Sequence, residues 1–134
     1  MKAIVFAVLA GLCWGVGEIF TKGALNTAKV GPLTALLVRT LVTLPLAFLA
    51  YLIASNVWKT EPAGWWRDLT PSIWAQLILG SGVLAGFAGV FFFYLGLGSP
   101  GGDISKIRPI AFALAPATAV LLGWAVLHEG MSVR

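Results

Sequence analysis

The stretch from Leu69 to Gly102 carries no charged residue, and this feature constrains the fold more than any other in the chain. A helix needs about 20 mostly apolar residues to cross the hydrocarbon core of a bilayer. The chain as a whole is also apolar, since 59% of its 134 residues are hydrophobic, 10% are charged and the mean hydropathy is +0.93. A soluble domain carries about 25% charged residues. The composition therefore indicates an integral membrane protein.

Four apolar runs of membrane length follow one another along the sequence. We expect transmembrane helices over about residues 3–25, 33–54, 72–97 and 104–127. A chain of this length has room for one domain. The predicted fold class is all-α, an integral membrane bundle of four transmembrane helices, with residues 1–134 forming a single domain. Pro45 and Pro116 lie inside two of the helices and are expected to bend them.

Residues 55–70 form the one long polar connection, and they combine charged side chains with Trp58, Trp65 and Trp66. Tryptophan beside charged residues is typical of the headgroup level of a membrane. We expect this loop to lie on the membrane surface in contact with lipid. Basic residues divide almost evenly between the two sides of the bundle, so a dual-topology dimer and a fixed orientation set by a partner both stay open.

Three charged residues, Glu18, Lys22 and Arg39, interrupt the first two apolar runs. A charge inside a bilayer is costly and persists mainly where it faces a cavity or a partner. At 1.5 Å of rise per residue, Glu18 and Arg39 lie at nearly equal depth on adjacent antiparallel helices. Trp14 shares the helix face of Glu18 and Lys22. These residues are the candidates for substrate binding or proton coupling, and the alternative is a buried ion pair that only holds two helices together.

Glycines are frequent in the third run, where Gly82 and Gly86 form a small-xxx-small pair and Gly89 follows. Small residues let helix backbones approach closely in lipid. We therefore expect Gly82, Gly86 and Gly89 to pack helices, either within one subunit or between two. The aromatic run 91–94 comes next, and most of it is expected to face lipid or neighbouring helices.

Other function classes lack the residues that they need. The net charge of +4 comes without a basic run of the nucleic-acid type, and no nucleic-acid partner is expected. Cys13 is the single cysteine, which excludes a disulfide within the chain, and it is interpreted as a small buried hydrophobe. His128 and Glu129 have no second ligand at metal spacing. We predict no metal site, no cofactor and no catalytic residues.

Several stretches resemble EamA-type proteins of the drug/metabolite transporter superfamily. Gly-Leu-Cys-Trp-Gly at 11–15, followed by Phe20, Lys22 and Leu25, is similar to the opening helix of that family, and Arg39 is similar to an arginine often found in its second helix. The resemblance at the other end of the chain rests on the run 102–109 and then on Pro116, Ala119, Leu122, Gly123, Leu127 and Glu129.

This resemblance implies a small export or exchange protein that works as a homodimer or as paired homologous subunits. The distantly similar small multidrug resistance proteins have four helices per subunit and use a first-helix glutamate for proton-coupled exchange, and Glu18 stands at a comparable place. In single-unit EamA proteins the residues after Glu129 lead into a fifth helix, whereas this chain ends at Arg134. A four-helix protein and a unit whose neighbour supplies the missing packing both stay open.

We predict a secondary transporter, namely a proton-coupled exporter or exchanger of small metabolites or amphiphilic compounds, in the plasma (inner) membrane of a bacterium or archaeon. It is not an enzyme. One alternative is a non-transporting accessory subunit of a larger membrane complex, in which the charges are structural pairs. The other is a component of a lipid-phosphate flippase, whose basic vestibule would be formed by Arg39, Lys106 and Arg108.

Overall fold

The computed structural model describes residues 2–62 and 64–127, and these contain helices and turns but no strand. In chain order the helices are α1 (Lys2–Asn26), α2 (Pro32–Ile53), η1 (Ala54–Trp58), α3 (Trp65–Asp68), α4 (Pro71–Ala75), η2 (Gln76–Gly89), α5 (Val90–Gly98) and α6 (Ile104–Leu127), where η marks π-helical winding.

Consecutive elements join into four helices that are long and apolar enough to cross a membrane, which are Lys2–Asn26, Pro32–Trp58, Pro71–Gly98 and Ile104–Val126. The predicted all-α class with four membrane-length helices is confirmed, and the chain is an integral membrane protein. The second span runs beyond residue 54, because η1 continues α2 until Lys59 takes a left-handed conformation with φ of 51°. Helical residues continue through Pro45 in α2 and through Pro116 in α6, so neither proline interrupts its helix.

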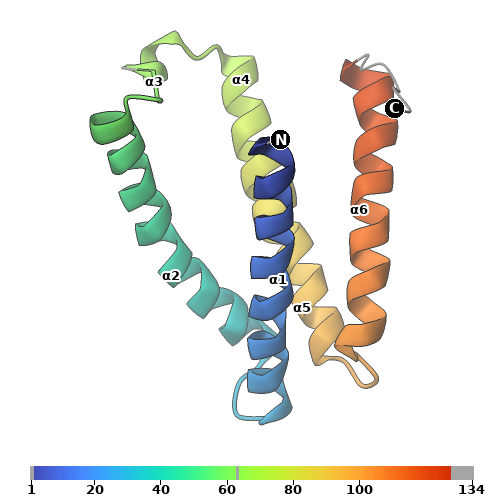
Figure 1. Cartoon of the computed structure of the whole chain (residues 1–134). Coiled ribbons are helices and arrows are strands. Elements are labelled where there is room, and N and C mark those ends of the chain that lie inside the picture. The colour runs from blue at the N-terminus through green and yellow to red at the C-terminus, as the bar shows by residue number, and fades with distance from the viewer. Residues whose placement is uncertain (1, 63, 128–134) are drawn as a thin grey trace.

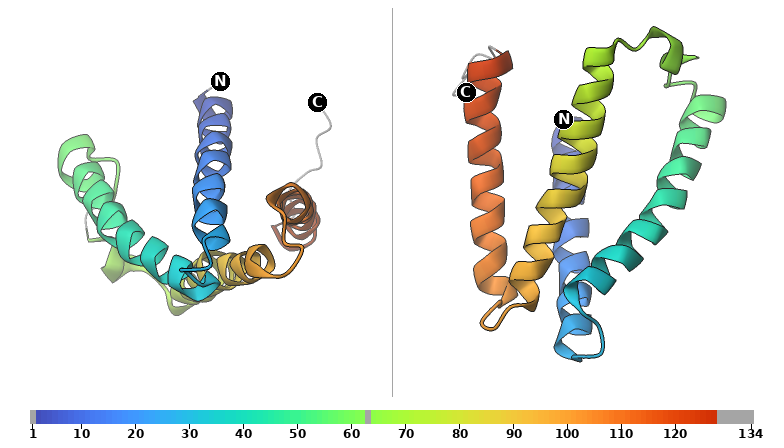
Figure 2. Two further views of the ribbon diagram at one scale, coloured as in Figure 1. Left: turned by 90° about the horizontal axis from the view of Figure 1, so that it is seen from below. Right: turned by 180° about the vertical axis from the view of Figure 1, so that it is seen from behind.

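The four spans converge at one end of the bundle and diverge towards the other (Figure 1). The α1–α2 turn and the α5–α6 turn lie at the converged end. At the open end, α2 leans away from α1, and α3 lies in the connection that returns the chain to α4 (Figures 1 and 2). Lys2 and Leu127, the first residue of α1 and the last of α6, lie towards this open end.

Glycines make the converged end tight. A Cβ atom on Gly98 would collide with the ring of Pro32 at the start of α2. A Cβ atom on Gly102 would meet the backbone oxygen of Gly96 and would lie 2.9 Å from that of Leu97. Only glycine fits such close approaches without a shift of the backbone. This end therefore holds the well-buried side chains of Leu36, Tyr94 and Leu97.

The predicted surface loop contains an aromatic cluster centred on Trp65. Its indole nitrogen donates a hydrogen bond to the Tyr51 hydroxyl at 2.9 Å, and its ring packs edge-on against Tyr51 and Trp66. Trp74 at the start of the third span completes the cluster. This arrangement ties the loop to the end of α2 at the level where aromatic residues of membrane proteins concentrate.

The three glycines expected to pack helices contact only their own helix within the described chain. The Cβ positions of Gly82, Gly86 and Gly89 lie 3.6, 3.0 and 3.5 Å from the carbonyl oxygen five residues earlier, as π-helical winding requires, and no neighbouring helix comes within 4 Å. Packing of these glycines against a second subunit stays a prediction.

Candidate functional site

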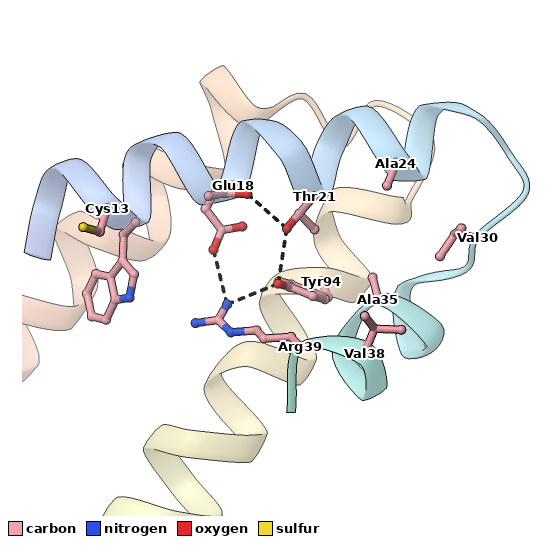
Figure 3. A pocket seen from close by; sticks show the side chains of 11 residues that line it. Cys13, Glu18, Thr21, Ala24, Val30, Ala35, Val38, Arg39 and Tyr94 are labelled. Carbon is pink, nitrogen blue, oxygen red and sulfur yellow. Dashed lines mark hydrogen bonds and ion pairs between the residues drawn. The ribbon is translucent and has the colours of Figure 1, made fainter. Parts of the chain in front are cut away.

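Three helices bring polar side chains together near the converged end. Glu18 comes from α1, Arg39 from α2 and Tyr94 from α5, and they surround an open-sided cavity of about 510 Å³ (Figure 3). The lining is otherwise mostly apolar, with Cys13, Trp14, Gly17, Thr21, Ala24, Val30, Ala35 and Val38.

Glu18 and Arg39 meet, as their equal depth suggested. Arg39 Nη1 lies 3.5 Å from Glu18 Oε1, which is long for a charge-assisted hydrogen bond. The Glu18 side chain is only 7% exposed, whereas that of Arg39 is 36% exposed. Glu18 Oε2 is buried and has no hydrogen-bond partner among residues 2–62 and 64–127. The carboxyl group is therefore half-paired, with one oxygen left for a proton or a ligand.

Tyr94 fixes the position of the arginine. Its hydroxyl accepts a hydrogen bond from Arg39 Nη1 at 3.2 Å and lies 3.4 Å from Thr21 Oγ1. Because the Thr21 hydroxyl donates to the Gly17 carbonyl at 3.2 Å, Tyr94 is the donor to Thr21. A directed chain of hydrogen bonds thus runs from Arg39 through Tyr94 and Thr21 to the backbone of α1.

Lys22 is directed elsewhere. Its ammonium group donates to the Leu97 carbonyl oxygen at 2.8 Å, and Lys22 does not line the cavity. Leu97 is the penultimate residue of α5, where carbonyl groups lack helical partners and a cation is favourable. Of the four predicted site residues, the structure thus brings Glu18, Arg39 and Trp14 to one cavity, and Lys22 caps α5 beside it.

The exposure of Cys13 differs from the interpretation based on the sequence. It was interpreted as a buried hydrophobe, but it is exposed and lines the cavity. The reason is the divergence of α1 and α2, which leaves this face of α1 without a covering helix (Figure 2). A free thiol therefore reports access to the cavity.

The basic residues of the suggested flippase vestibule do not share one cavity. Arg39 lines the cavity with Glu18, whereas Arg108 lines a separate groove between α1 and α6. The Lys106 ammonium group donates a hydrogen bond to Asp103 Oδ2 at 2.8 Å at the start of α6. This hydrogen bond holds the pKa of Asp103 below its ordinary range.

Two residues noted in the sequence, His128 and Glu129, lie outside the described residues. Glu129 is part of the family resemblance.

The residues that the sequence did not single out are Tyr94 and Thr21. Tyr94 stood among four consecutive aromatic residues, and only its hydroxyl distinguished it from the three phenylalanines. Thr21 lies three residues after Glu18 and seven after Trp14, so helical spacing was the signal that could have placed it on the same face. Within residues 2–62 and 64–127 there is no group of three histidine, cysteine or acidic residues that could hold a metal ion.

Four membrane-length helices, three of which surround a half-paired carboxyl group, define a polytopic membrane protein with a polar site between its helices. The model of the EamA-like transporter family matches residues 1–134, and the chain belongs to this family. Proteins of this family are transporters of the drug/metabolite kind. No curated protein and no solved structure gave a match.

Proposed function

We propose that this protein is a proton-coupled exporter or exchanger of small metabolites or amphiphilic compounds. The observation that carries the proposal is the buried, unpartnered Oε2 of Glu18 beside a cavity with mostly apolar walls. A carboxyl group in this position can hold a proton while the cavity is empty. It can give up the proton when a substrate replaces it, which couples the two fluxes.

Arg39 and Trp14 would complete the site. Arg39 balances the charge of the deprotonated Glu18 and is only loosely held at 3.5 Å, so its guanidinium can follow the carboxylate or a substrate. Trp14 offers an aromatic wall against which an apolar or cationic substrate can pack. The Tyr94 hydroxyl accepts a hydrogen bond from the same Arg39 nitrogen at 3.2 Å and would limit how closely Arg39 pairs with the carboxylate.

The working unit would be a dimer in the plasma (inner) membrane. Most large apolar side chains of α1, α2 and η2 are exposed within one chain and must be covered by lipid or by another subunit. The cavity is open-sided, so a partner could complete its wall. Gly82, Gly86 and Gly89 offer a stretch of η2 where a second helix backbone could approach.

The test is substrate-driven proton flux in proteoliposomes, measured with a panel of lipophilic cations and small metabolites. Native protein should show flux with at least one compound, and Glu18→Gln should abolish it while the protein still folds and assembles. Glu61→Gln is the matched control, because it makes the same chemical change in the exposed loop. Loss of flux in both variants would show that the effect is not specific to Glu18.

A non-transporting accessory subunit is the second candidate, and three contacts favour it. Lys22 is engaged at the end of α5 and Arg39 is bonded to both Glu18 and Tyr94, as structural residues would be. On this account native protein gives no flux with any compound. Gly82→Leu would disrupt its association, whereas Gly80→Leu, outside the glycine pair, would not.

A further inference from the structure

A second polar feature, separate from the Glu18 cavity, lies on another face of α1. It is a groove of about 400 Å³ between α1 and α6, lined by Ile19, Ile104, Ser105, Arg108, Pro109 and Phe112. Arg108 supplies its only charged side chain. The groove therefore combines one cation with largely apolar walls.

The Arg108 guanidinium is held against α1 and over an aromatic ring. Its Nη1 donates to the Trp14 carbonyl oxygen at 3.1 Å, and its Cζ lies 4.7 Å from the centroid of the Phe112 ring. The guanidinium lies beside Gly15, where a Cβ atom would make ordinary van der Waals contacts at 3.8 Å from Nη1 and 3.9 Å from Nη2. The arginine is thus positioned before any ligand arrives.

Arg108 forms no ion pair within 4.0 Å in the part of the chain that the structure describes, and the charge of Glu18 reaches it only over a longer distance. The two ion pairs within 4.0 Å are Arg39–Glu18 and Lys106–Asp103, and neither includes Arg108. A guanidinium has five N–H donors, and a single hydrogen bond is formed here, to a backbone carbonyl. A charged arginine among apolar side chains favours an anion that can occupy the remaining donors.

The position of Arg108 near the start of α6 indicates which kind of anion would bind. It lies four residues after Ile104, about 6 Å along α6 from the start of the helix. The Asp103–Lys106 pair at the same end is exposed, as expected near the headgroup level. Two large apolar side chains that line the groove, Ile19 and Phe112, are 59% and 37% exposed and suit contact with acyl chains.

We propose that the groove between α1 and α6 is a binding site for the phosphate headgroup of an anionic phospholipid. The Arg108 guanidinium would pair with the phosphate, and Ser105, one helical turn earlier on α6, would add a hydroxyl donor. Ile19 and Pro109 would contact the glycerol and the first part of an acyl chain. A free phosphate ion would leave these walls unused, so the lipid is the ligand. The site does not depend on the proposed transport activity.

The test is native mass spectrometry of the full chain, released from detergent after incubation with phosphatidylglycerol or with phosphatidylcholine. Native protein should retain phosphatidylglycerol in preference to phosphatidylcholine. Arg108→Gln should weaken phosphatidylglycerol binding about tenfold, as expected for the loss of a charge-assisted hydrogen bond. Arg67→Gln, which removes an arginine from α3, is the matched control and should bind like native protein.

Three results would overturn the proposal. They are equal retention of the two lipids, unchanged binding by Arg108→Gln, and an equal loss in Arg67→Gln, which would indicate general charge attraction. Inorganic phosphate added alone should leave phosphatidylglycerol in place, and displacement at equal concentration would make the site one for the free anion. If Arg108→Gln does not fold, Arg108→Lys keeps the charge but loses the planar fork, and it should bind severalfold more weakly than native protein. Native affinity in that variant would contradict the assignment.

Discussion

Arg39 Nη1 lies 3.5 Å from one carboxylate oxygen of Glu18, and the other oxygen of Glu18 is buried without a partner. Tyr94 holds the same Arg39 nitrogen at 3.2 Å. The arginine is therefore shared between a carboxyl group and a phenol. A small movement towards either would change how much of the Glu18 charge is compensated, which is the property that a proton-coupled site needs.

Tyr94→Phe removes the hydroxyl that contacts Arg39 and keeps the aromatic ring in place. Removing the hydroxyl deletes its hydrogen bonds with Arg39 and Thr21, which should lower the free energy of unfolding by about 1–3 kcal/mol. Freed from the hydroxyl, Arg39 should pair more closely with Glu18, stabilise the carboxylate and move the pH dependence of transport to lower pH. Equilibrium unfolding in detergent and flux measured across a pH series check both effects.

Tyr51→Phe is the control for this variant. It also removes a hydroxyl that accepts a hydrogen bond, from Trp65 at 2.9 Å, but it does so at the end of α2, where α2 meets the surface loop. It removes one hydrogen bond and should lower the free energy of unfolding by about 1 kcal/mol, but it should leave the pH profile unchanged. A profile that moves equally in both variants would contradict the role assigned to Tyr94.

Lys22→Met should loosen the converged end of the bundle. The variant keeps the length of the side chain but loses the 2.8 Å bond to the Leu97 carbonyl oxygen that joins α1 to the end of α5. We expect faster labelling of Cys13, the single cysteine, by a water-soluble maleimide added on the side of the α1–α2 turn.

Lys29→Met, in the exposed α1–α2 turn, is the matched control and should label like native protein. Equal labelling rates for Lys22→Met and native protein would show that the Lys22 contact does not restrict access from this side.

Gly98→Ala should destabilise the fold, because its Cβ atom would overlap the ring of Pro32. Overpacking of this kind costs about 1–3 kcal/mol. Gly23→Ala is the comparison within α1, where nothing lies within 4 Å of the added atom and the better helix propensity of alanine should leave stability equal or higher. Thermal unfolding in one detergent ranks the two variants, and equal midpoints would argue against the tight contact.

Asp103 should titrate below its ordinary range, since the Lys106 ammonium hydrogen-bonds the carboxylate and lowers its pKa. A carboxyl group whose folded pKa is lowered adds stability above its unfolded pKa, and that contribution is lost as pH falls through the folded pKa. Lys106→Gln should therefore raise the Asp103 midpoint, measured by carbon NMR of the labelled carboxyl group. An unchanged midpoint would show that the pair does not form in solution.

The sequence predicted the membrane class and the Glu18–Arg39 contact for a simple reason. Helices in a bilayer are long and straight enough that counting residues from a shared turn gives depth. Such counting does not show which neighbouring helix a side chain faces. The phase of α5 depends on the π-helical winding of η2, so the sequence could not show that Tyr94 would face Arg39 while Phe92 is exposed.

Lys22 illustrates the same limit. Its spacing from Glu18 suggested a shared site, but the tight α5–α6 turn at Gly98 and Gly102 places the Leu97 carbonyl within its reach. That contact depends on the packing of three helices. Residue spacing along α1 contains no information about it.

The central claim is that Glu18 exchanges a proton for a substrate, and proton release on binding tests it most directly. Purified protein in weakly buffered detergent would receive the compound that gives the highest flux, while a pH indicator records released protons. Native protein and Glu61→Gln should release up to about one proton per bound substrate, because one buried carboxyl group titrates. Glu18→Gln should release none. Equal proton release by Glu18→Gln and native protein would contradict the account.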